Sequence, residues 1–170
     1  VRRRRRKGRS HDKQANTSSS SSFLVIPLIS VPPNHSYSLD TSSFQRNGDY
    51  APSRFDAQRD AVNLIANAKT QQNPESTVAL LKAAGGCQTL CTLTTDVGRL
   101  LSAMHRVPLG GALEFCRALQ VAALCLKHRQ NKTQQQRIVA FVGSPLADAD
   151  AELPKLAKKL KKNNVAVDVV

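Results

Sequence analysis

The chain contains no tryptophan, and aromatic residues make up only 4% of its 170 residues. Aliphatic side chains must therefore supply most of the core, because 41% of the residues are apolar overall. No apolar run reaches the roughly 20 residues that a membrane-spanning helix needs. The apolar stretch at 23–29 is short and is interrupted by Pro27. The sequence thus predicts one domain with its own core and no association with a membrane.

Motifs for metal binding and catalysis are missing as well. The four cysteines are widely spaced and form no Cys-x-x-Cys pair, which argues against structural zinc and favours buried thiols. No GxGxxG loop follows a predicted strand, and no GxSxG motif is present. The four histidines have no serine, cysteine or aspartate at a recognisable catalytic spacing. We therefore expect neither enzymatic activity nor a bound cofactor.

Positive charge is concentrated at the start of the chain. Of the net charge of +13, residues 1–13 contribute +7, through eight Lys or Arg residues against one Asp. The segment 1–34 also contains a serine tract and has neither helical nor strand periodicity, so we predict a disordered basic tail. Such an arginine run is also compatible with nucleic-acid binding, nuclear import, part of a transit peptide or sequence foreign to the native gene product.

Residues 35–170 alternate between strand and helix patterns. Short apolar runs bounded by turn residues predict strands at 77–81, 87–93, 137–142 and 165–170, after a weaker first strand at 35–40. Apolar residues at helical spacing predict helices at 51–69, 96–104, 112–128 and 151–162. This alternation is typical of an α/β domain with an open, mostly parallel sheet and helices on both faces.

Four collinear segments, at 46–58, 60–75, 126–145 and 158–169, carry a specific similarity. The chain resembles the amino-terminal von Willebrand factor type A domain of the ubiquitin-receptor subunit of the proteasome regulatory particle, in its plant or algal form. The resemblance implies the Rossmann-like type A fold over 35–170. That fold would be incomplete at its C-terminal end, because the family domain continues with another strand and a closing helix. No similarity covers 1–34.

The type A fold often binds a divalent cation through Asp-x-Ser-x-Ser, a threonine in a second loop and an aspartate in a third. Asp40 and Ser42 match the first two positions of this pattern. Phe44, Ala112 and Gly143 with Ser144 stand where further oxygen ligands are expected. Since magnesium requires near-octahedral oxygen ligation, we regard Asp40 and Ser42 as a degenerate remnant and expect no metal site.

The resemblance implies a non-catalytic docking domain that anchors the polyubiquitin receptor in the 26S proteasome regulatory particle, in the cytoplasm and the nucleus. Its partners would be lid and base subunits. In the family, polyubiquitin is captured by short helical motifs further downstream, and we expect no such motif in this chain. The candidate docking residues are Arg46, Asn47, Gly48, Asp49, Tyr50, His128, Arg129, Gly143, Ser144 and Pro145.

Two other functions stay open at this point. A basic nucleic-acid-binding protein would use the arginine tail and the lysine face of the helix at 151–162, although aromatic stacking residues are missing nearby. A metal-dependent adhesion module would need a third ligand that the sequence does not supply. We therefore favour the docking domain over a function in which nucleic acid is the partner.

The first and last predicted strands also suggest low stability. In the family's sheet the first strand is central, and here it contains His35, Ser36 and Ser38 among the expected aliphatic positions. The apolar strand at 165–170 would form an exposed edge that invites pairing between chains. We therefore expect a marginally stable domain with a tendency to aggregate.

Overall fold

Strands and helices alternate along the chain much as the apolar patterns predict. The computed structural model describes residues 33–146 and 152–170, and most of the predicted basic tail lies outside these ranges. In chain order the elements are β1 (Pro33–Leu39), the 3₁₀ helix η1 (Ser43–Arg46), α1 (Arg54–Gln72), β2 (Val78–Lys82), β3 (Gln88–Thr94), α2 (Val97–His105), α3 (Phe115–Lys127), β4 (Gln135–Ala140), α4 (Glu152–Lys162) and β5 (Val165–Val169). No helix in these described ranges is both long and apolar enough to cross a membrane.

The strands form one sheet in the order β3-β2-β1-β4-β5. The central strand β1 pairs in parallel with β2 and β4, and β4 pairs in parallel with β5. Only β3 is antiparallel, to β2. This arrangement confirms the expected open, mostly parallel sheet, with the first strand at its centre and β5 at one edge.

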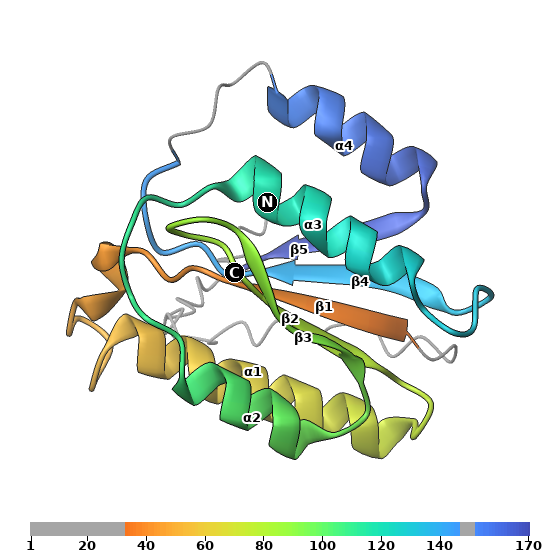
Figure 1. Ribbon diagram of the computed structural model, residues 1–170, viewed down its shortest axis with the longest axis horizontal. Helices are drawn as coiled ribbons and strands as arrows, with labels where there is room; N and C mark the ends of the chain where they lie inside the picture. Colours follow the sequence, from red (N-terminus) through yellow and green to blue (C-terminus); the bar gives the residue numbers. More distant parts are fainter. Residues whose placement is uncertain (1–32, 147–151) are drawn as a thin grey trace, which may run out of the picture.

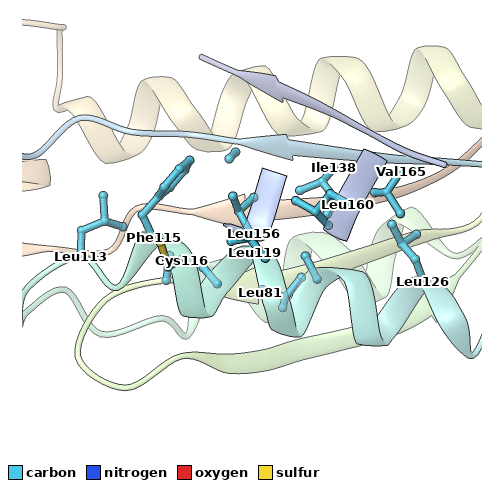
Figure 2. Close-up of a cluster of buried hydrophobic side chains, with 14 residues drawn as sticks. Leu81, Leu113, Phe115, Cys116, Leu119, Leu126, Ile138, Leu156, Leu160 and Val165 are labelled. Carbon is cyan, nitrogen blue, oxygen red and sulfur yellow. The ribbon is translucent and has the colours of Figure 1, made fainter. Parts of the chain in front are cut away.

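Helices cover both faces of the sheet, as Figure 1 shows. Helices α1 and α2 lie on one face, where Val62, Leu100 and Met104 pack with Tyr37 and Leu39 of β1. Helices α3 and α4 lie on the other face, and Figure 2 shows the hydrophobic cluster there. Most of its members come from α3, α4 and the strands, and they include Leu81, Leu119, Leu126, Ile138, Leu156, Leu160 and Val165.

Two helices begin three residues later than the periodicity predicts, and local hydrogen bonds explain both differences. α1 begins after Ser53, whose Oγ accepts the backbone N–H of Asp56 at 3.1 Å and donates to the Asp56 carboxylate at 2.6 Å. α3 begins at Phe115 because the backbone N–H of Glu114 donates to the carbonyl of Ala83 at 2.9 Å. Residues 112–114 therefore pair with the loop after β2 instead of joining the helix.

The polar residues of β1 divide between the two faces of the sheet. Because strand side chains alternate, Ser36 and Ser38 lie on the face opposite Tyr37 and Leu39, and all four are buried. That opposite face carries α3, which contacts β1 and has no exposed area at Ala118. Serine is small enough to let the helix lie close to the central strand. The two serines thus permit the close packing of α3 on β1, although burying their hydroxyl groups costs free energy.

His35 is the largest polar side chain buried in β1. Its imidazole stacks on the ring of Tyr37, with the ring centroids 6.0 Å apart, and neither ring nitrogen has a hydrogen-bond partner among the residues that the structure describes. Burial, together with the smaller effect of the positive charges of Lys69 and Arg137, lowers the pKa of His35 to about 4. The fold therefore holds this imidazole in its neutral form.

This arrangement predicts that stability falls with acidification. The unfolded chain takes up the His35 proton below about pH 6.5, whereas the folded chain resists it until about pH 4. The free energy of unfolding should decrease by up to about 3 kcal/mol as pH falls across this window. We predict that His35→Val raises stability at neutral pH by about 1–3 kcal/mol, because it removes unpaired buried polar atoms, and flattens the pH dependence. Urea unfolding at a series of pH values measures both effects.

Helix α2 offers a matched control in the exposed His105. His105→Gln should leave the pH dependence of unfolding as it is in the unmodified chain. An equally steep loss of stability between pH 6.5 and 4 in His35→Val would contradict the assignment to the buried imidazole.

Candidate functional site

The carboxyl edge of the sheet is organised around the buried carboxylate of Asp40, the first residue after β1. Oδ1 accepts the backbone N–H of Ser42 at 2.9 Å. Oδ2 accepts the side-chain amide of Gln45 at 2.8 Å, the Ser144 hydroxyl at 2.7 Å and the backbone N–H of Gly143 at 3.0 Å. Four donors from the loops after β1 and β4 therefore converge on one charge.

These donors keep Asp40 ionised. Burial is the largest influence on its pKa and acts to raise it, but the hydrogen bonds from Ser144, Ser42 and Gly143 together lower the pKa below its ordinary value. A carboxylate held by several N–H and O–H donors is well stabilised without a counter-ion. The buried charge thus serves as a structural connection between two loops.

Gln45 is the member of this cluster that sequence reasoning missed. It lies in η1 with no exposed area, donates to Asp40, and accepts the side-chain amide of Gln58 of α1 at 2.5 Å. Gly143 lies so close that a Cβ atom there would collide with the Gln45 amide. Phe44, which stands at the last position of the Asp-x-Ser-x-Ser pattern, is instead 54% exposed. Gln45 lies one position beyond the ligand pattern, so the sequence does not indicate its role. That role depends on η1, which turns the Gln45 side chain inward.

Hydrogen-bond donors occupy the positions around Asp40 that a cation would need. Binding there would require displacement of the Gln45 amide and of the Gly143 N–H from Oδ2. Within 33–146 and 152–170, no group of three or more His, Cys, Asp or Glu side chains is placed to hold a metal ion. The donor set therefore supports the expectation of no metal site, which stays a prediction.

Arg54 connects two of the predicted docking segments. Its guanidinium forms a bidentate ion pair with Asp49, with Nη2 2.6 Å from Oδ2 and Nε 2.7 Å from Oδ1. Its Nη1 donates to the carbonyl of Gly143 at 2.7 Å. Hydrogen bonds from Arg54 hold the pKa of Asp49 below its ordinary value. The segments at 46–50 and 143–145 are thus brought together, and we call this arrangement the Arg54 clamp.

A third loop adjoins the same edge. The Arg46 guanidinium donates to the carbonyl of Leu109 at 2.9 Å, and the Gly110 N–H donates to the carbonyl of Thr41 at 2.8 Å. The loop between α2 and α3 is therefore fixed against the loop after β1. Of the predicted residues in these loops, Asn47, Gly48 and Pro145 are exposed and Ser144 faces Asp40.

Two aromatic side chains project from this fixed loop. Phe44 is 54% exposed and Tyr50 is 65% exposed, and they flank Arg46 and Asp49 in the sequence. The remaining aromatic residues in the described part of the chain are all buried, namely Tyr37, Phe55, Phe115 and Phe141. Within the described ranges, the exposed aromatic side chains therefore lie in one segment, the loop at 43–50.

His128 and Arg129 do not belong to this site. They follow the C-terminal end of α3, which lies at the opposite, amino edge of the sheet (Figure 1). The Arg129 guanidinium donates to the carbonyls of Leu126 at 3.1 Å and Lys132 at 2.7 Å. Arg129 thus closes the end of α3 and shapes the following turn, while the neighbouring His128 is exposed.

Comparison with known families and structures agrees with this architecture. The model of the von Willebrand factor type A domain matches residues 38–145. The chain belongs to the von Willebrand factor type A domain family. The crystal structure of the SpRpn10 VWA domain superposes with a TM-score of 0.77 at 47% identity, covering 82% of this chain and 74% of that one. A conserved hypothetical protein, BatB from Bacteroides thetaiotaomicron, shares the fold alone, with a TM-score of 0.68 at 14% identity.

Several similar curated proteins are proteasome subunits. The 26S proteasome non-ATPase regulatory subunit 4 homolog of Oryza sativa subsp. japonica is 56% identical over 133 residues, which cover 78% of this chain and 33% of the rice protein. The 26S proteasome regulatory subunit RPN10 of Saccharomyces cerevisiae is 51% identical over 78% of this chain and 50% of its own length. The chain thus spans one third to one half of these two relatives.

The donors around Asp40 predict the effect of removing its charge. We predict that Asp40→Asn lowers the free energy of unfolding by about 3 kcal/mol, because the new amide group turns an acceptor into a donor that faces other buried donors. Denaturant unfolding at neutral pH measures the loss. Asp60→Asn, at an exposed position of α1, is the matched control and should change stability little. A loss at Asp40 as small as that at Asp60 would refute the structural role of the charge.

The same donor set predicts the response to divalent cations. We expect isothermal titration with Mg²⁺ and with Ca²⁺ to detect no stoichiometric site tighter than about 10⁻⁴ M, a value within the ordinary range of calcium sites. The physical reason is that Asp40 already accepts four hydrogen bonds. A tighter site that disappears in Asp40→Asn would overturn this prediction.

Proposed function

We propose that this domain is a non-catalytic docking module that anchors a proteasome subunit in the regulatory particle, between subunits of the lid and the base. The similarity to proteasome regulatory subunits over 78% of the chain supports the proteasome as the assembly in which this domain docks. The proposal concerns the anchoring step. We assign polyubiquitin capture to other segments of the receptor, and we expect the domain to work in the cytoplasm and the nucleus.

One observation supports the carboxyl edge as the docking surface. Phe44 and Tyr50 are exposed on a loop whose backbone is fixed by Asp40, Gln45 and the Arg54 clamp. Large side chains on a preorganised loop lose little conformational entropy on binding, and a few such residues dominate the affinity of many interfaces. The loop therefore has the properties of an anchor for a protein partner.

The other functions considered from the sequence have less support. A metal-dependent adhesion site would need an accessible carboxylate, and Asp40 is already surrounded by donors. Single-stranded nucleic acid would favour a basic groove with aromatic side chains, but the exposed aromatic residues lie beside Asp49, away from the lysine-rich α4.

The docking proposal predicts the behaviour of an aromatic double variant. Phe44→Ser with Tyr50→Ser should weaken association with purified regulatory particles at least tenfold, because truncating interface anchors typically costs about 2 kcal/mol or more. Particles that lack the endogenous receptor subunit should be titrated with the labelled full chain, and the bound fraction measured after sedimentation.

Leu64 and Leu124 provide a matched control, since they are 73% and 53% exposed on α1 and α3. Leu64→Ser with Leu124→Ser removes a similar apolar area and should leave the association unchanged. Equal losses in both double variants would show that docking does not depend on the loop at 43–50. Failure of the unmodified chain to bind would refute the proposed function itself.

A further inference from the structure

Along residues 33–170, positive charge is distributed asymmetrically. Residues 33–126 contain eight Lys or Arg against seven Asp or Glu, so this region is nearly neutral. Residues 127–170 contain nine Lys or Arg against four Asp or Glu. The excess comes mainly from α4, which carries Lys155, Lys158, Lys159, Lys161 and Lys162. The helix thus differs in charge from the rest of the domain.

Helix α4 presents most of these lysines on one solvent-facing surface. Leu156 and Leu160 are buried against the sheet and α3, and Leu153 packs beside them. Lys155, Lys158, Lys159 and Lys162 recur at spacings of three and four residues on the opposite side, and all are exposed. We call these four residues the α4 lysine face. In Figure 1, α4 is the outermost element of its layer, beyond α3.

Within 33–146 and 152–170, no ion pair neutralises the charges of this face. The ion pairs formed within the described ranges involve arginines, and none includes a lysine of α4. Asp168 of β5, the acidic residue at the following strand, is already paired with Arg137 at 2.7 Å. Like charges at a spacing of four residues also repel one another and slightly destabilise the helix. An external anionic partner would remove this repulsion.

We propose that the α4 lysine face binds an acidic segment of another protein subunit, rich in Asp or Glu. The inference rests on the proposed function, since an assembly subunit meets protein surfaces, and it adds a second contact on a layer remote from the loop at 43–50. The four lysines extend over about 10 Å of rigid helix, at a rise of about 1.5 Å per residue. This row of compact charges matches a row of carboxylates on a helix or extended strand, and such complementarity mainly increases the association rate and fixes orientation.

An acidic protein segment fits this face better than nucleic acid does. The only aromatic residue in 127–170 is Phe141, which is buried, so the face offers no platform for base stacking. Arginine, the residue suited to bidentate contacts with phosphate, is absent from α4. Double-stranded DNA is therefore the competing probe in the test.

The test uses nuclear magnetic resonance of the ¹⁵N-labelled full chain, because the basic N-terminal segment also attracts anions and its signals must be followed separately. Titration with an oligoglutamate peptide should shift the amides of 155–162 in a manner that weakens with added salt. Lys158→Glu with Lys162→Glu should weaken this site about tenfold. Arg99→Glu with Arg106→Glu makes the same change in net charge at two exposed positions, one in α2 and one directly after it, and should leave the site unchanged.

Each outcome decides the inference. Shifts confined to 1–32, or equal losses in both charge-reversal variants, would refute a specific site on α4. Shifts of α4 that occur at lower concentration with DNA of matched charge would identify a nucleic-acid surface instead. In the sedimentation assay, Lys158→Glu with Lys162→Glu should reduce association with regulatory particles, whereas Arg99→Glu with Arg106→Glu should not. Normal association of the α4 variant would refute this inference and leave the proposed function standing.

Discussion

The buried carboxylate of Asp40 is the interaction on which the carboxyl edge of the sheet depends. A charge with no exposed area is tolerated only when donors surround it, and here the donors come from the loops after β1 and β4. Meeting that requirement places Gln45 inside the domain and fixes the path of the chain up to α1. The exposed position of Phe44 and Tyr50 is a consequence of this internal ordering. The hydrogen bonds that stabilise the buried Asp40 carboxylate thus determine which side chains this loop exposes.

The layer structure was predictable from the sequence because it depends on patterns that are local. Apolar runs at 77–81 and 137–142 and helical spacing at 151–162 each specify an element, and their alternation specifies a mostly parallel sheet. The central strand β1 was the exception. Its serines and His35 give no apolar signal, and its place was inferred from the family resemblance alone. The position of α3 across β1 explains why small polar residues are accepted there.

The site was predictable only in part. The segments at 46–50 and 143–145 were chosen by resemblance, and folding brings them together, but the residue that joins them, Arg54, was not identified. Its role depends on contacts across 89 positions of sequence, which no local pattern encodes. His128 and Arg129 were assigned to the same function, yet parallel topology places the end of α3 at the other edge. Residues that follow a helix and residues that follow a strand thus lie at opposite edges of the sheet, although the resemblance groups them together.

The contact between Gly143 and Gln45 has an evolutionary consequence. The two residues lie nearly a hundred positions apart in the sequence, yet each limits the volume available to the other. A side chain at 143 fits only if 45 carries something shorter, and a shorter residue at 45 removes one donor from Asp40. Another hydroxyl group or a water molecule would then have to donate a hydrogen bond to Asp40 in place of the Gln45 amide. Across descendants of this chain, substitutions at 45 and 143 should therefore arise as pairs, and an alignment would record them as covarying columns.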